Sequence, residues 1–269
     1  MALPDYAMRQ PTFPEMYEQH LVHPLFRPWA EILVERLSLS PGDRVLDLAC
    51  GTGIVARLAK QRLGDNGHVV GVDVSPQMLA VANQVAPDIE WREGNATALP
   101  IDDGERFTAV ACQQGLQFFP DRPAAACEMR RALAPGGRVA VATWRSLDDA
   151  PIFRELQEVA ERFVGPITDQ RHSFGDPDAL AGLLMNAGLS DVHVEPITRT
   201  IRFNEGPRFV RLNTMALVGM SQAAKTMTDD ERARVVDAIV TESRSIAARY
   251  AEGTGLAFEI GANVATARG

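Results

Sequence analysis

The sequence has few cysteines, few aromatic residues and no long apolar run. Its three cysteines, Cys50, Cys112 and Cys127, are widely spaced and form no C-x-x-C pair, which fits neither a disulfide framework nor a zinc site. We therefore expect buried apolar thiols, no metal site and a cytoplasmic location. The longest apolar stretches, such as residues 139–144, fall far short of the roughly 20 residues that cross a bilayer. No membrane span is predicted.

Positive charge is also in short supply. The 35 acidic residues outnumber the 27 basic ones, which gives a formal charge of -8. Because binding to phosphates needs clustered lysine and arginine, no nucleic-acid partner is expected. The first 20 residues carry Asp5, Glu15 and three prolines where a secretory signal would have a basic start and an apolar core, so export is not expected.

Between residues 44 and 144, short β-branched runs alternate with helical patterns. The predicted strands are 44–48, 68–72, 89–92, 108–112 and 138–143. Helices with apolar residues every three or four positions are predicted at 53–63, 76–86 and 122–133. Pro135-Gly136-Gly137 is expected to end the last helix and turn the chain into the next strand. This alternation indicates consecutive βαβ units and an α/β fold with a parallel sheet.

Further elements are predicted on both sides of this core. An amphipathic helix is expected before it at 24–39, and helices are expected after it at 152–163 and 177–187. A strand at 192–203, helical stretches at 205–220 and 229–250, and an alternating run at 256–267 complete the chain. The two late helical stretches therefore form an insertion between the last two strands.

The segment that carries the chemistry begins at the end of the first predicted strand. There Asp47 precedes a loop of small residues, with Gly51 and Gly53, that opens a helix. Glycines let the backbone approach a ligand closely, and free N–H groups at a helix start suit a polar or anionic group. Asp73 ends the second strand, where a carboxylate accepts hydrogen bonds from both ribose hydroxyls of an adenosine. These features predict an adenosine-containing cofactor.

Two kinds of cofactor fit this pattern. The run Gly51-x-Gly53-x-x-Ala56, with Asp73 downstream, also satisfies the loose dinucleotide fingerprint, so an NAD(P)-dependent oxidoreductase on a similar sheet is an alternative. Asp47 favours another ligand, because a carboxylate beside the loop would repel a pyrophosphate but could bind an ammonium group. S-adenosylmethionine carries an α-amino group and a sulfonium, and no phosphate.

The chain resembles the class I S-adenosylmethionine-dependent methyltransferases, of the small-molecule type that includes the ubiquinone and menaquinone biosynthesis methyltransferases. The matching segments follow the family's order and spacing over roughly residues 40–145. They are VLDLACGTG (45–53), VVGVDVSPQML (69–79), EGNATALPI (93–101), FTAVACQQGLQFFPD (107–121) and RRALAPGGRVAVATW (130–144).

This resemblance implies a set of site residues. Asp47 would address the amino group of the cofactor, Asp73 the ribose hydroxyls, and Asn95, where relatives usually carry aspartate, the adenine amino group. Tyr17 would close the site from an N-terminal helix. The implied cofactor-binding residues are Tyr17, Asp47, Ala49, Gly51, Thr52, Gly53, Asp73, Val74, Met78, Asn95, Ala96, Gln113 and Gln114. Gln117 and Phe118 would line the acceptor, and no residue is named as a base.

The resemblance also implies a Rossmann-like three-layer αβα sandwich. Its seven-stranded, mostly parallel sheet would have the last strand antiparallel, between the fifth and sixth. Residues 1–40 are expected to form an N-terminal helical cover, 41–204 the cofactor-binding core, 205–252 a helical lid between strands six and seven, and 253–269 the final strand. The implied activity is in-line transfer of a methyl group to an O, N or C nucleophile of a small metabolite. A non-catalytic S-adenosylmethionine-binding protein is a further alternative, and the oligomeric state, a homodimer included, stays open.

Overall fold

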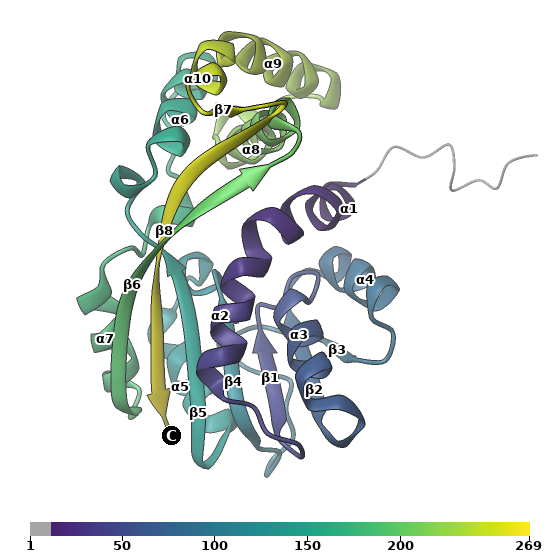
Figure 1. Ribbon diagram of the computed structural model, residues 1–269, viewed down its shortest axis with the longest axis vertical. Helices are drawn as coiled ribbons and strands as arrows, with labels where there is room; N and C mark the ends of the chain where they lie inside the picture. The colour runs from purple at the N-terminus through teal and green to yellow at the C-terminus, as the bar shows by residue number, and fades with distance from the viewer. Residues whose placement is uncertain (1–11) are drawn as a thin grey trace, which may run out of the picture.

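One mixed β-sheet organises the molecule in the computed structural model, which describes residues 12–269 (Figure 1). Its strands are β1 (Arg44–Leu48), β2 (His68–Asp73), β3 (Glu90–Glu93), β4 (Phe107–Gln113), β5 (Leu133–Trp144), β6 (Ser190–Phe203), β7 (Ala251–Glu252) and β8 (Gly255–Arg268). The spatial order is β3-β2-β1-β4-β5-β8-β6, with the short β7 paired to β8. β8 is antiparallel to β5 and β6, whereas the pairs from β3 to β5 are parallel. The predicted sheet, with its antiparallel strand between the fifth and sixth, is confirmed.

Helices cover both faces of the sheet, which explains why the central strands β1 and β4 are mostly apolar between their ends. The α-helices are α1 (Phe13–Tyr17), α2 (Arg27–Leu37), α3 (Ile54–Leu63), α4 (Pro76–Val85), α5 (Arg122–Ala132), α6 (Pro151–Val164), α7 (Pro177–Asn186), α8 (Gly206–Met220), α9 (Asp229–Glu242) and α10 (Arg244–Arg249). Successive β1 side chains enter different cores: Val45 joins Leu33 of α2 and Ala59 of α3, while Leu46 joins Met129 of α5.

The remaining helical elements are short. They are the π-helical η2 (Glu18–Phe26) and the 3₁₀ turns η3 (Gly64–Asn66), η4 (Leu116–Phe118), η5 (Leu147–Asp149), η6 (Gln170–His172) and η7 (Ala223–Lys225). The helix predicted at 24–39 in fact begins earlier, because η2 carries the chain through Pro24 into α2. Proline lacks an N–H, and the wider π turn accommodates that missing donor.

Strands β6 and β8 extend beyond the rest of the sheet as a long two-stranded arm (Figure 1). Residues 262–268 of β8 pair with β5, whereas residues 256–261 pair with β6, at positions 198–203, and Leu256 also pairs with Ala251 of β7. Helices α6, α8, α9 and α10 lie around this upper part of the arm in Figure 1. Phe203, Phe209 and Phe258 pack there with ring centroids 4.6 to 5.9 Å apart.

Three expectations need correction. The helical stretch predicted at 229–250 is interrupted at Ser243, whose φ of -78° and ψ of 0° end α9 before α10 begins. Pro135-Gly136-Gly137 does not separate helix from strand but lies within β5, where it produces a register shift against β4. Cys127 is exposed rather than buried, because it lies on the solvent side of α5, whereas Cys50 and Cys112 are buried as predicted.

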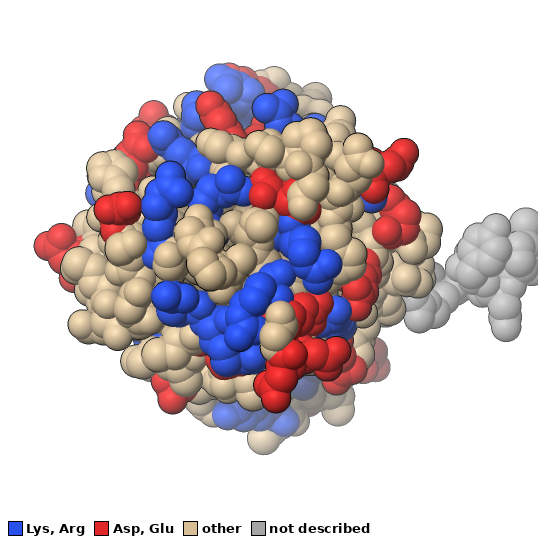
Figure 2. All heavy atoms as spheres, turned by 90° about the horizontal axis from the view of Figure 1, so that it is seen from below, with Lys and Arg blue, Asp and Glu red and all other residues tan. Residues whose placement is uncertain are grey.

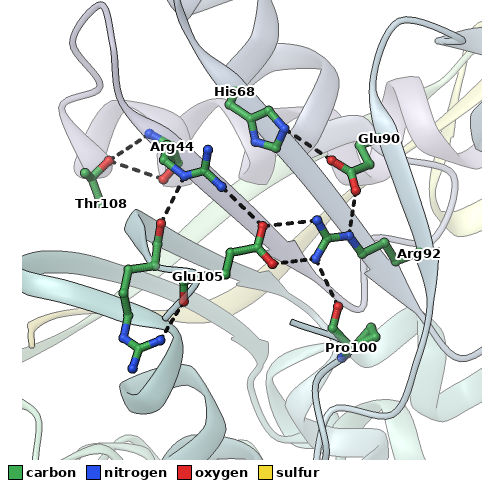
Figure 3. Close-up of polar contacts among 8 residues, drawn as sticks. Arg44, His68, Glu90, Arg92, Pro100, Glu105 and Thr108 are labelled. Atoms are coloured by element: carbon green, nitrogen blue, oxygen red, sulfur yellow. Dashed lines mark hydrogen bonds and ion pairs between the residues drawn. The ribbon is translucent and has the colours of Figure 1, made fainter. Parts of the chain in front are cut away.

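The underside of the molecule, formed by the amino ends of the parallel strands, carries many basic side chains, nearly all of them arginine (Figure 2). A network of ion pairs holds these strand ends together (Figure 3). Glu105 accepts hydrogen bonds from Arg92 at 2.7 and 3.0 Å and from Arg44 at 3.2 Å, and Arg92 also bonds Glu90 at 2.7 Å. Within residues 12–269, no helix combines the length and apolarity needed to cross a bilayer.

Candidate cofactor and acceptor site

The predicted cofactor residues lie where the strand order reverses, at the carboxyl ends of β1, β2 and β4. Chain connections lead away from this point in both directions, and open α/β sheets bind ligands in the crevice that results. Parallel pairing of Leu48 with Val72 brings the ends of β1 and β2 side by side. Gly51 N–H donates to Asp73 Oδ2 at 2.8 Å, so the small-residue loop and the second carboxylate are in direct contact.

The loop glycines serve two different purposes. Gly53 has a φ of +86°, and a Cβ added there would lie 2.2 Å from Cη2 of Trp91. Gly71, on the neighbouring strand, faces the same ring, with an added Cβ 2.3 Å from Cζ3. Gly51 also has a positive φ, +55°, but a Cβ there would meet no atom within 4 Å. Gly53 therefore makes room for Trp91, and Gly51 is the glycine that faces open space beside Asp73.

Asp47 is a buried carboxylate close to a second negative charge. Its Oδ2 accepts a hydrogen bond from Ala56 N–H, in the first turn of α3, at 2.9 Å. Burial raises the pKa of Asp47 to about 7, with a further contribution from Asp73, while the Ala56 bond opposes the rise. A cationic group beside these carboxylates would offset the cost of burying the Asp47 charge and its repulsion by Asp73. A pyrophosphate would add further negative charge and increase the repulsion.

The N-terminal segment reaches this site through Tyr17. Burial and the nearby carboxylates of Glu18, Asp73 and Asp47 raise the pKa of the Tyr17 hydroxyl. The Tyr17 ring packs against Phe26 with centroids 5.0 Å apart. Glu18 pairs with Arg57 of α3 at 2.8 Å. The N-terminal segment is therefore attached to α3, the helix that follows the glycine loop. Its residues 1–11 lie outside the described part of the chain.

Three glutamines lie at the end of β4 or just after it, and their side-chain amides are short of partners. Gln113 Nε2 donates to the Phe26 carbonyl at 2.9 Å, but its Oε1 is buried without a partner in residues 12–269. Both polar side-chain atoms of Gln114 and of Gln117 are likewise unpaired within that range. Gln114 also adopts a φ of +45°, a strained value for a residue with a side chain. Buried amides of this kind suit a polar ligand.

The residues expected around the adenine form a more open surface. Val74, directly after Asp73, is 69% exposed, and Phe118, expected at the acceptor, is 46% exposed. Met78 is half-buried in α4, and Ala96 is buried. Asn95 Oδ1 accepts from both the N–H and the hydroxyl of Thr97, each at 3.0 Å. Both lone pairs of that oxygen are used, so Asn95 is a weaker candidate for the adenine amino group than the resemblance implies.

Of the other predicted residues, Ala49 has a φ of +55° at the exit of β1, and Thr52 is buried with its hydroxyl unpaired among the described residues. The structure also adds residues that the sequence did not single out. Trp91 packs over two glycines, Phe26 contacts both Tyr17 and Gln113, and Arg57 pairs with Glu18 of the N-terminal segment. None of the three lies in a recognisable motif, and each acts through a contact with a distant part of the chain.

The fold and the paired carboxylates at the switch point are those of a class I S-adenosylmethionine-dependent methyltransferase. A family model described as a methyltransferase domain matches residues 45–137. The 2-phytyl-1,4-naphtoquinone methyltransferase of Thermosynechococcus vestitus is 32% identical over 191 residues, covering 64% of this chain and 84% of the relative. The demethylmenaquinone methyltransferase of Staphylococcus epidermidis is 32% identical over 200 residues, covering 68% and 80%.

Solved structures agree on the fold. Phosphoethanolamine N-methyltransferase 2 of Haemonchus contortus, in complex with S-adenosyl-L-methionine, has a TM-score of 0.57 at 19% identity, covering 95% of this chain and 55% of that one. The cyclase SpnF has a TM-score of 0.54 at 22% identity, covering 90% and 80%. Since one fold carries different chemistries, the sequence relatives decide the family. The chain belongs to the methyltransferase domain family and is an S-adenosylmethionine-dependent methyltransferase. The oxidoreductase alternative is not supported.

Proposed function

We propose that this methyltransferase acts on a reduced quinone with an apolar side chain, and that the residues described above hold the cofactor. The single observation that carries the acceptor class is the 32% identity, over most of their length, to two relatives named as methyltransferases of naphthoquinone and menaquinone type. An oxidised quinone ring is electrophilic, so the acceptor must arrive as the hydroquinone, whose ring carbon next to an ionised hydroxyl is a nucleophile.

The cofactor assignment rests on charge and space. Bound S-adenosylmethionine supplies a methyl carbon activated by the sulfonium leaving group. We assign the amino group of the cofactor to Asp47 and the ribose hydroxyls to Asp73, with Gly51 giving the backbone room to approach. Tyr17 covers the site, and the unpaired Oε1 of Gln113 and the unpaired amide of Gln114 face the polar part of the ligand. Val74 and Met78 offer apolar surface to the adenine. The chain thereby aligns the reactants and excludes water.

We assign supporting roles to the two added segments. Residues 1–40 act as the cover, supported by the contacts of Tyr17 and Glu18 with the site. Residues 205–252 act as a lid over the acceptor, supported by their place at the end of the β6–β8 arm, with 41–204 and 253–269 forming the core. We also propose a small-molecule acceptor as the partner, no nucleic acid, a cytoplasmic location and a homodimer as the state to test by light scattering.

The test combines binding with turnover. Calorimetry should detect binding of S-adenosylmethionine and S-adenosylhomocysteine to the wild-type protein, and D73N should weaken both at least tenfold because its amide cannot replace two carboxylate oxygens. Under anaerobic conditions, mass spectrometry should detect a methylated product from 2-alkyl-1,4-naphthohydroquinone. No binding of either cofactor at millimolar concentration would refute the assigned site. Binding without transfer to any hydroquinone, phenol or amine would instead favour the non-catalytic alternative.

A further inference from the structure

One histidine of the short turn η6, His172, is held in a defined protonation form. Its Nδ1 lies 2.8 Å from the carbonyl oxygen of Arg145, directly after β5. A carbonyl oxygen can only accept, so Nδ1 carries the proton and Nε2 keeps a free lone pair. Nε2 has no hydrogen-bond partner within residues 12–269, and the ring packs on Phe153 of α6 at 5.7 Å between centroids. The imidazole is therefore oriented, with its basic nitrogen available.

The turn that carries His172 lies between the glutamine loop and the lid. On one side, Ser173 Oγ donates to the carbonyl of Gln117 at 3.2 Å, and η6 contacts η4. On the other side, Arg171 Nη1 donates to Asn213 Oδ1 of α8 at 2.8 Å. These two contacts place His172 between the loop that follows β4 and helix α8.

The elements on both sides of this turn carry unpaired polar atoms. Both amide atoms of Gln117, Nδ2 of Asn213 and the hydroxyl of Thr214 are buried and lack a partner in the described part of the chain. An unpaired buried polar group costs about 1–3 kcal/mol, so four such atoms in neighbouring elements point to a polar ligand between them. The hydroxyl groups of a hydroquinone can donate and accept hydrogen bonds, so they can pair with these amide and hydroxyl groups.

We propose that His172 is the general base of the methyl transfer, removing the hydroxyl proton of the acceptor at Nε2. This inference rests on the proposed function. The O–H bond of the hydroquinone breaks and its proton goes to Nε2. The released electron density forms the ring carbon–methyl bond while the methyl–sulfur bond breaks, leaving its electron pair on sulfur. The methylated carbon then loses its hydrogen to water as a proton, so that the ring regains aromaticity, and the imidazolium returns its proton to the acceptor oxygen, which restores the hydroxyl group.

The surroundings keep the imidazole neutral before the reaction. Burial lowers the pKa of His172, and the Arg171 guanidinium acts in the same direction, while the Arg145 carbonyl and Asp169 oppose them. Asp169 is itself paired with Arg171 at 2.6 Å, so most of its charge is compensated. On α6 the ring packs against Phe153, which carries no charge. A neutral imidazole at neutral pH is the form that a base requires.

The test uses a substitution that separates orientation from basicity. In His172→Asn the amide nitrogen occupies the position of Nδ1 and can still donate to the Arg145 carbonyl, but no atom replaces Nε2. We expect the rate of methyl transfer to 2-alkyl-1,4-naphthohydroquinone to fall at least 100-fold. The melting temperature should not change, and the affinity for S-adenosylmethionine should stay within twofold of wild type. His193→Asn, on exposed β6, is the matched control and should keep wild-type activity. Imidazole added to His172→Ala should restore part of the rate.

A second readout does not depend on turnover. The measurement is NMR of protein with isotope-labelled histidines, saturated with S-adenosylhomocysteine. The signal of the His172 ring, identified by its absence in His172→Asn, should shift when 1,4-naphthohydroquinone is added. Transfer by His172→Asn within threefold of wild type, or a ring signal that the hydroquinone leaves in place, overturns the inference while the proposed function stands. If wild-type protein methylates no hydroquinone, the proposed function fails, and the assignment of His172 fails with it.

Discussion

Gly51 and Gly53 differ in what surrounds them, and substitution should separate their roles. Gly53→Ala forces a Cβ into the Trp91 ring at a positive φ, so we expect a loss of about 2–4 kcal/mol in unfolding free energy. Gly51→Ala adds only the backbone strain, about 1–2 kcal/mol, because no atom lies within 4 Å. Its methyl group would instead occupy the space assigned to the cofactor, so binding of S-adenosylmethionine should weaken at least tenfold.

Chemical denaturation and calorimetry measure the two effects separately. Gly42→Ala, at a φ of +87° with no neighbour within 4 Å, is the control for strain without a ligand. Equal cofactor affinity in Gly51→Ala and Gly42→Ala would contradict the assignment of Gly51.

The raised pKa of Asp47 predicts that cofactor binding becomes stronger as the pH rises. Burial raises its pKa to about 7, so below that pH the folded protein holds a proton there, and a protonated carboxyl cannot pair with the ammonium group of the cofactor. By linkage, affinity at pH 6 should be about tenfold lower than at pH 8. Asp47→Asn should bind more weakly at pH 8 and lose the pH slope. A wild-type affinity that is flat over this range would refute the assigned role.

At the scale of single elements, the ion-pair network of Figure 3 connects the amino ends of the strands. Glu105, with a side chain only 13% exposed, bonds Arg92 and Arg44, so Glu105→Gln should cost about 1–2 kcal/mol at pH 7. Arg92, chiefly through its hydrogen bonds, holds the pKa of Glu105 below the ordinary 4.5. Stability from this group is therefore present above that value and lost as the pH falls through the lowered pKa.

Urea denaturation at pH 7 and pH 3 tests this sign, because the difference between wild type and Glu105→Gln should shrink at the lower pH. Glu252→Gln is the matched control, since its ion pair with Arg202 has a similar length, 2.9 Å, but an acid side chain that is 54% exposed. A larger loss in the control than in Glu105→Gln would contradict the prediction.

Most helices and strands were predictable from the sequence. Each packs against the core, so its apolar residues recur at the spacing of a helix or a strand. The first strand was predicted at its exact bounds, 44–48, and the long late strands within two residues. The break at Ser243 and the π-helical passage through Pro24 were not, since neither interrupts the apolar pattern. In the site, motif spacing assigned Gly51 and Asp73 to the same cofactor, and the structure adds that the two residues are hydrogen-bonded to each other. The roles of Trp91, Phe26 and the Arg145–His172 bond depend on long-range packing that leaves no local signal.

At the scale of the whole molecule, one apolar core continues from the sheet into residues 205–252, the segment proposed as a lid. The same buried cluster contains Leu33 of α2, Phe209 of α8, and Phe203 and Phe258 of the arm. Because the core is continuous, Phe203→Ala should destabilise the entire fold by about 3–5 kcal/mol and keep a single unfolding transition. Calorimetry checks this. A separate early transition of the lid, with the main transition unmoved, would show that the arm unfolds independently.

The antiparallel strand β8 has a consequence for how the chain is made. It fills the gap between β5 and β6 and follows the lid helices in chain order. A growing chain that has completed β6 and residues 205–252 therefore still displays two unpaired strand edges, which are templates for association with other chains. Synthesis of the final strand removes both edges in one step. A chain that is released before residue 255 would keep both edges unpaired and would be prone to aggregate.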